Sequence, residues 1–172
     1  MSECKTCVCP DCGTEIYHKK TGAILFEGYM ADLFARAIRM ARTQEVRYRE
    51  RYDDKNSDWK IGKFDRCVTA DDFKREGLIT QYTRLAGLKH WGLLSQREEW
   101  WHQGIYQVTE KAAQFIRGEI TIPRSVIVAR GKVVDFSADH VSFRISYEGE
   151  WNAIPDWIRD WRSGSKTQLE FI

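Results

Sequence analysis

Residues 69–94 read TADDFKREGLITQYTRLAGLKHWGLL, and this stretch decides the fold that the sequence predicts. Thr69 can cap a helix, and two aspartates follow in the first turn, where the helix dipole favours anions. Gly77 ends this short helix, and a second helix is predicted to run from Ile79 to Trp91, with Gly92 terminating it. Two helices separated by one glycine can cross steeply, which lets the second project. The apolar side of the second helix comprises Tyr82, Leu85, Leu88 and Trp91.

A two-stranded hairpin is predicted next. The first strand begins at Leu93-Leu94-Ser95, a loop spans Glu98 to Gly104, and the second strand covers Ile105–Val108. Thr109 then caps a helix over residues 110–117. Helix, turn, helix and hairpin in this order are typical of the winged helix-turn-helix.

Three segments resemble the winged-helix domains of small bacteriophage and bacterial mobile-element proteins. They are residues 82–94, which contain the pattern Leu-x-x-Trp-Gly-Leu, residues 106–119, whose helix ends in Phe-x-x-Gly, and Ile122-Pro123. The resemblance covers about residues 69–150 and implies a winged-helix fold. It says less about function, because winged-helix domains bind DNA, RNA or other proteins.

Upstream of this region, a helix is predicted from Tyr29 to about Arg47. Its apolar residues recur at three- and four-residue steps, and Arg36, Arg39 and Arg42 line another face. Residues 46–52 alternate and could either continue the helix or form a strand. Residues 53–58 are the best candidate for a loop.

Downstream, a hairpin is predicted from residues 125–129 and 132–136, followed by a strand over His140–Tyr147. A short helix follows, with Pro155 at an early position. The predicted class is α+β: a winged helix-turn-helix core with an N-terminal metal-bound hairpin and a C-terminal β appendage. The predicted domains are a cysteine-rich cap, the winged helix, and the appendage with its terminal helix, at residues 1–28, 29–120 and 121–172.

Two Cys-x-x-Cys pairs stand at the beginning of the sequence, and such pairs suit thiolate ligation of a metal ion. A structural zinc site is favoured, and an iron–sulfur cluster is the alternative. One residue separates the pairs, which is tight for a single tetrahedral ion, so His18 could replace one thiolate. His18 otherwise lies on the surface of a hairpin predicted over Thr14–Leu25. The predicted ligands are Cys4, Cys7, Cys9 and Cys12.

Length and charge restrict the class of protein. The chain has 172 residues and a formal net charge of +2, so it is not a generic polycation. Positive charge is concentrated in residues 31–68, which sum to +3. The N-terminus lacks a basic segment followed by an apolar one, and no apolar run approaches the ~18–20 residues of a membrane span. A cytoplasmic protein without a membrane partner is expected.

The second helix of the core carries the strongest functional candidates. No acidic residue occurs between Ile79 and Trp91, whereas polar surface helices usually mix both signs of charge. Arg reads guanine, Gln reads adenine, and Thr and Lys can contact phosphates. Contact with double-stranded DNA is therefore predicted for Thr80, Gln81, Thr83, Arg84, Lys89 and His90.

The hairpin loop suggests a different partner. An acidic and aromatic tip would be repelled by phosphates, and tryptophans favour protein interfaces. This tip contains Glu98, Glu99, Trp100 and Trp101.

The sequence thus predicts a zinc-stabilised DNA-binding regulator of phage type, for which homodimerisation would be natural. The alternative is a phage-encoded protein that binds and modulates a host enzyme or defence complex through the Glu98–Trp101 tip. No catalytic motif is found, so an enzyme is not expected.

Overall fold

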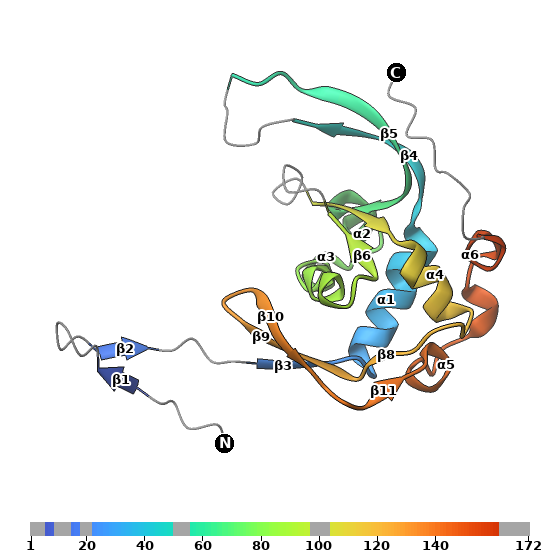
Figure 1. Ribbon diagram of the computed structural model, residues 1–172. Coiled ribbons are helices and arrows are strands. Elements are labelled where there is room, and N and C mark those ends of the chain that lie inside the picture. Colours follow the sequence, from blue (N-terminus) through green and yellow to red (C-terminus); the bar gives the residue numbers. More distant parts are fainter. Residues whose placement is uncertain (1–5, 9–14, 18–21, 50–55, 97–103, 162–172) are drawn as a thin grey trace.

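The chain folds as an α+β structure in which small antiparallel sheets surround a central helix (Figure 1). This computed structural model describes residues 6–8, 15–17, 22–49, 56–96 and 104–161. The α+β class predicted from the sequence is confirmed.

The central helix, α1 (Tyr29–Met40), is buried around most of its circumference. Alanine, leucine and methionine favour helix formation, and apolar residues on more than one face are typical of a helix inside a core. Its buried residues are Met30, Ala31, Leu33, Phe34, Ala35, Ala37 and Ile38.

The chain leaves α1 as a strand. Strand β4 (Arg42–Tyr48) pairs with β5 (Lys60–Thr69). Of the two alternatives for residues 46–52, the strand is correct for Val46–Tyr48, whereas β5 was not predicted. The predicted helix to Arg47 is therefore wrong beyond Met40: Ala41 is already extended, and the following residues alternate in exposure as strand residues do. The predicted loop at residues 53–58 falls between the two strands, with residues 53–55 outside the described part.

These strands belong to a four-stranded antiparallel sheet. Only the last residues of β5, Cys67–Thr69, pair with β7. The hairpin predicted around the 98–104 loop is confirmed in its two strands. The spatial order is β4, β5, β7 (Ile105–Val108) and β6 (Leu94–Ser95).

The helix-turn-helix segment begins as predicted. Helix α2 (Ala70–Arg75) has Thr69 at its N-cap, and Thr69 and Asp72 form a reciprocal capping box. Gly77 then adopts a positive φ of 70° and ends the helix.

The second helix differs from its prediction. It is divided into α3 (Ile79–Tyr82) and a 3₁₀ helix, η1 (Leu85–Trp91). A 3₁₀ helix has three residues per turn, so residues at three-residue spacing share one face. Leu85, Leu88 and Trp91 have this spacing and are all buried. The core thus selects the tighter helix, and the Trp91 indole N–H donates to the Pro123 carbonyl at 2.8 Å.

The C-terminal part confirms one predicted hairpin and corrects another. Helix α4 (Glu110–Ile116) is capped by Thr109, and β9 (Ser125–Ala129) pairs with β10 (Lys132–Phe136) as predicted. The predicted Thr14–Leu25 hairpin is wrong because its two halves have other partners. Strand β2 (Glu15–Tyr17) pairs with β1 (Thr6–Val8), and β3 (Gly22–Leu25) pairs with β9.

The predicted strand His140–Tyr147 is also largely wrong. Strand β11 (His140–Val141) pairs with β8 (Ile122–Pro123) and ends at once. The Ser142 hydroxyl then accepts the Ile145 backbone N–H and caps the short helix α5 (Phe143–Ser146). The chain ends its described part with a 3₁₀ turn, η3 (Trp151–Ala153), and the predicted terminal helix, α6 (Asp156–Asp160).

Aromatic side chains from distant segments form the centre of the core. The Phe26 ring makes edge contacts with Phe34, Trp91 and Phe115, and the Phe34 ring contacts Phe143 at 5.5 Å between centroids. One continuous cluster thus includes residues on both sides of the predicted boundary at 120/121. The boundaries themselves stay a prediction.

We expect Gly104→Ala to destabilise the protein more than Gly118→Ala. Both glycines have positive φ, 67° and 77°, so both variants carry a backbone strain of about 1 kcal/mol. A Cβ at position 104 would lie 1.9 Å from Tyr82 Oη, whereas one at 118 would meet no atom within 4 Å. The Tyr82 ring is held by Phe73 and Tyr106, at 5.8 and 6.0 Å between centroids.

Urea unfolding should therefore show an additional loss of about 1–3 kcal/mol for Gly104→Ala. Equal losses in the two variants would show that Tyr82 is not packed as described.

Candidate nucleic-acid interface

The polar residues of α3 and the two residues after it, Thr83 and Arg84, lie at or near the surface. Thr80, Thr83 and Arg84 are exposed, and Gln81 is half-buried. The Thr80 hydroxyl donates to Gln81 Oε1 at 2.8 Å, and the Thr83 hydroxyl donates to the Thr80 carbonyl at 2.8 Å. The Arg84 guanidinium lies over the Tyr29 ring of α1, 5.6 Å from its centroid. The Thr80 hydroxyl thus lies beside the Gln81 amide, whereas the Arg84 guanidinium lies against α1.

Lys89 and His90 are separated from this group by the end of α3. Both are half-buried in η1, and Lys89 Nζ donates to Gln96 Oε1 at 3.1 Å. Burial, assisted by the charge of Lys89, lowers the pKa of His90, so its imidazole is neutral at pH 7. The six predicted DNA contacts therefore do not lie on one continuous helical face.

Two arginines of α1 border the start of α3. A pocket of about 260 Å³ lies between α1 and the α2–α3 turn, lined by Arg36, Arg39, Met40, Glu76 and Leu78. Arg36 Nε also contacts Asp32 at 2.7 Å. Arg42, predicted on the same helical face, lies on β4 instead.

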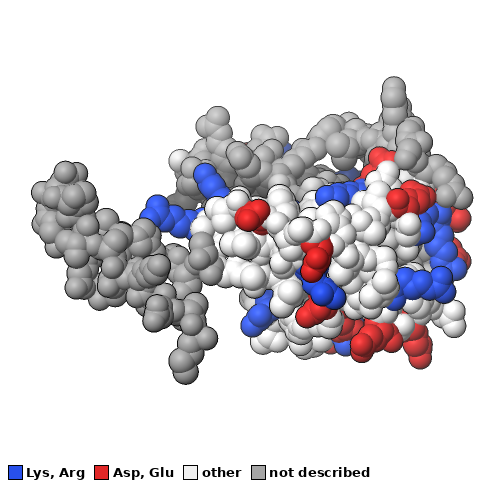
Figure 2. Space-filling view, turned by 60° about the horizontal axis from the view of Figure 1, so that its bottom comes forward, with Lys and Arg blue, Asp and Glu red and all other residues white. Residues whose placement is uncertain are grey.

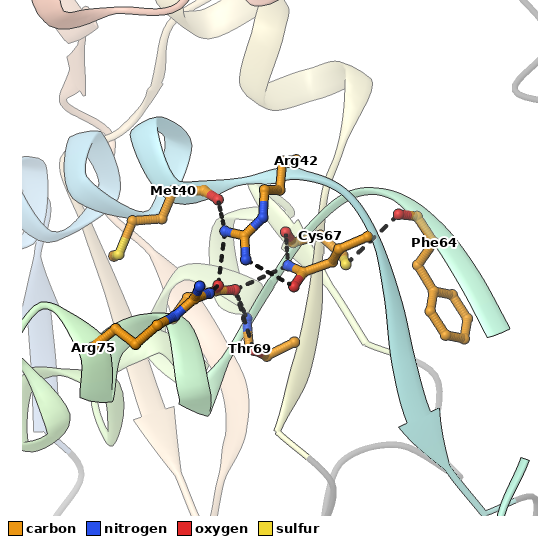
Figure 3. A network of polar contacts seen from close by, with 8 residues as sticks. Met40, Arg42, Phe64, Cys67, Thr69 and Arg75 are labelled. Atoms are coloured by element: carbon orange, nitrogen blue, oxygen red, sulfur yellow. Dashed lines mark hydrogen bonds and ion pairs between the residues drawn. The ribbon is translucent and has the colours of Figure 1, made fainter. Parts of the chain in front are cut away.

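The first residues of β4 are bound to α2 through one carboxylate, that of Asp72 (Figure 3). Its side chain is 1% exposed and accepts hydrogen bonds from Gln44 Nε2 at 2.9 Å and from the Thr69 backbone N–H at 2.8 Å. Arg42 contacts it at 2.8 Å, and Arg75 also donates to it. Groups from β4, β5 and α2 thus converge on one buried anion.

This environment determines two pKa values. Burial alone would raise the pKa of Asp72, but the hydrogen bonds from Gln44 and Thr69 and the charge of Arg42 hold it below its usual value. Burial raises the pKa of the nearby Cys67 thiol to about 11. Cys67 is therefore protonated at neutral pH and unsuited to nucleophilic chemistry.

Sequence reasoning missed a second group of cationic and aromatic residues, on the β4–β5 ribbon. The guanidinium groups of Arg47 and Arg49 lie 4.6 and 4.3 Å from the centroid of the Trp59 ring. The alternation from Val46 onward was a signal for one strand. The sequence of β5 contains no local pattern that predicts its pairing with β4. The position of Trp59 beside Arg47 and Arg49 could therefore not be predicted.

One face of the molecule lacks a continuous basic surface. Figure 2 views the molecule from the side of β8, β11 and α5 and shows a broad uncharged middle, with Lys and Arg interspersed among Asp and Glu. The described part of this face is not suited to a polyanion, because a polyanion requires clustered positive charge.

Several predicted site residues cannot be placed. Cys4, Cys9, Cys12 and His18 lie outside the described residues, and Cys7 is placed only through the backbone of β1. The tip residues Glu98, Glu99, Trp100 and Trp101 also lie outside the described part. The zinc site and the protein-binding tip stay predictions.

In comparisons with known proteins, no family model, curated protein or solved structure matches the chain. Within residues 22–49, 56–96 and 104–161, no helix combines the length and apolar character that crossing a bilayer requires.

We expect Asp72→Asn to lower the free energy of unfolding by about 2–4 kcal/mol, because it removes a buried charge on which several donors converge. Asp71→Asn is the matched control: Asp71 is exposed in the same first turn of α2, so its loss should cost about 0.5 kcal/mol. Urea unfolding at neutral pH measures both effects.

The stability difference between wild type and Asp72→Asn should also depend on pH. The folded-state pKa of Asp72 is depressed, so its carboxylate stabilises the protein above the unfolded-state pKa of about 3.9. That stability is lost as the pH falls through the folded-state pKa. The difference in free energy of unfolding between wild type and Asp72→Asn should therefore shrink as the pH falls below about 3.9, and a constant difference would contradict the assignment.

Proposed function

We propose that this chain is a winged helix-turn-helix protein that binds duplex DNA as a regulator. One observation carries the proposal. The helix pair α2–α3 lies between β5 and β6 in the chain, and the strands are arranged in the order β5-β7-β6. The exposed residues of α3 and of the turn directly after it, Thr80, Thr83 and Arg84, are polar or cationic, and residues 79–84 contain no acid. This element order agrees with the winged helix expected from residues 69–118.

In this proposal α3 reads bases at the edge of the major groove, as the second helix of a helix-turn-helix does. Gln81 suits adenine and Arg84 suits guanine, while Thr80 and Thr83 suit phosphates or base edges. Arg36 and Arg39 would neutralise phosphates beside the start of α3. Lys89, bonded to Gln96, contributes positive charge at the margin, and neutral His90 contributes none.

The predicted zinc site belongs to the same proposal. Four cysteine thiolates fit a closed structural site, with Cys9 and Cys12 in the segment that connects β1 to β2. The ion would hold the N-terminal cap and would take no part in binding DNA. The expected setting is the cytoplasm of a bacterium that carries a phage or mobile element.

We expect Gln81→Ala/Arg84→Ala to weaken binding to the preferred duplex by about 2–6 kcal/mol, since each bidentate base contact is worth about 1–3 kcal/mol. The preferred sequence is first selected from a mixed duplex pool at two salt concentrations. Fluorescence anisotropy then measures the affinity of the variant for this duplex and for an unrelated one.

Arg144→Ala is the control for the loss of one positive charge outside the proposed interface. Arg144 lies over the Trp151 ring at 5.6 Å, the same distance as Arg84 over Tyr29, but on α5. It should leave the affinity unchanged. If wild type is not retained by any duplex at low salt, the DNA-binding proposal fails, and a protein partner becomes the target of a pull-down.

We expect one zinc ion per chain, measured by elemental analysis of the purified protein together with its mass under native conditions. After chelation the four N-terminal thiols should react with an alkylating reagent at pH 8. Cys67, with a pKa of about 11 and no exposure, should react only on unfolding. Iron in place of zinc, or five thiols that react together, would contradict this assignment.

A further inference from the structure

The outer part of the β4–β5 hairpin is a two-stranded ribbon. Pairs from Gln44↔Phe64 to Tyr48↔Lys60 continue beyond the residues that β5 shares with β7. No described strand pairs with the other edge of β4. Figure 1 shows the ribbon arching away from the helices. From Arg66 to Lys60, at about 3.3 Å per residue, the outer part of β5 is about 20 Å long.

One face of this ribbon combines cations with exposed apolar groups. Arg47 is paired with Ile61, so their side chains share a face, and Trp59 joins this face through its contacts with Arg47 and Arg49. Trp59 is 42% exposed and Ile61 is 70% exposed. The other face is closed by the edge contact between Tyr48 and Phe64, at 5.5 Å between centroids. Among the described residues, the Arg47 face is the one that presents exposed apolar side chains to a partner.

The charge of the ribbon favours an anionic partner. Residues 42–49 and 56–69 contain six Lys or Arg and three Asp or Glu. One of the acids, Asp65, is already engaged by the Thr43 hydroxyl at 2.5 Å and by Arg66 at 3.4 Å. A second acid, Glu45, lies directly opposite Lys63, so the cations in excess on the outer part of this face are Arg47 and Arg49.

We propose that the β4–β5 ribbon is a second DNA-binding element, which follows a groove of the duplex next to the site read by α3. The inference rests on the proposed function. A two-stranded ribbon fits the major groove, which is about 12 Å wide, and a reach of about 20 Å spans more than half of a helical turn of about 34 Å. Arg47 and Arg49 contact phosphates, while Trp59 and Ile61 pack against the sugars between them.

Contacts at the base of the ribbon explain why the ribbon and α3 would bind the same duplex. Gln44 and Arg42, at its base, are bound to Asp72 of α2. Leu78 N–H, directly before α3, is bound to the Phe73 carbonyl of the same helix at 2.8 Å. The ribbon and α3 are thus fixed to one short helix, and a duplex held by α3 meets the ribbon in a defined direction.

The test compares Arg47→Gln/Arg49→Gln with Arg130→Gln/Lys132→Gln. The second pair removes the same charge from another hairpin, where both side chains are exposed. The probes are a duplex of about 10 bp that carries the selected sequence and one of about 30 bp with the same centre. Anisotropy is measured over a series of salt concentrations.

We expect the ribbon variant to lose about tenfold or more in affinity for the long duplex and to reduce its salt slope by about 1.8, or 0.9 for each phosphate contact. Its affinity for the short duplex should stay close to that of wild type. The Arg130/Lys132 control should match wild type on both.

Lys63→Gln separates binding from folding because the cations stacked on Trp59 are Arg47 and Arg49, so this substitution leaves that stacking in place. It should reduce the salt slope on the long duplex by about 0.9 with an unchanged melting temperature. If wild type binds and Gln81→Ala/Arg84→Ala does not, yet both ribbon variants match wild type on the long duplex, the ribbon inference is overturned and α3 alone binds DNA. If wild type binds neither duplex, the proposed function and the ribbon inference fail together.

Discussion

The buried carboxylate of Asp72 is the interaction on which the arrangement of the other elements depends. It caps α2 through Thr69 and holds the start of β4 through Gln44 and Arg42. An isolated buried charge would be costly, and here several donors replace the water that the anion loses. Because those donors come from three elements, this carboxylate sets the angle between the sheet and the helix pair.

Burial of α1 provides the other constraint. The side chains of α1 are covered by η1, α4, α5 and the small sheets. Arg36 and Arg39 remain accessible at one edge of α1, near the start of α3. The aromatic cluster around Phe26 and Phe34 then connects the N-terminal strand β3 with the C-terminal segments. The candidate interface therefore lies on a rigid support.

The sequence predicted the elements whose signals are local. Thr69 and Gly77 bound α2, Thr109 caps α4, and the glycine turn at residues 130–131 connects β9 to β10. Of the six polar residues that the sequence singled out, Thr80, Thr83 and Arg84 are exposed, whereas Gln81, Lys89 and His90 are half-buried.

The remaining features depend on contacts between distant residues. No glycine or proline separates α1 from β4, so the pattern alone could not show where the helix stops. Strand β5 and the stacking of Trp59 on Arg47 arise only when two segments pair. The 3₁₀ form of residues 85–91 follows from the core rather than from propensity, and Ser142 overrides an alternating pattern by capping α5. For these, tertiary packing outweighed local preference.

The pairing of β3 with β9 has a consequence for synthesis of the protein. Gly22 faces Val128, so a strand made near the beginning finds its partner only about a hundred residues later, a contact of high sequence separation that closes slowly. Until residues 125–128 leave the ribosome, the edge of β3 has no partner in its sheet. Strand β3 therefore joins its sheet only after most of the chain has been made.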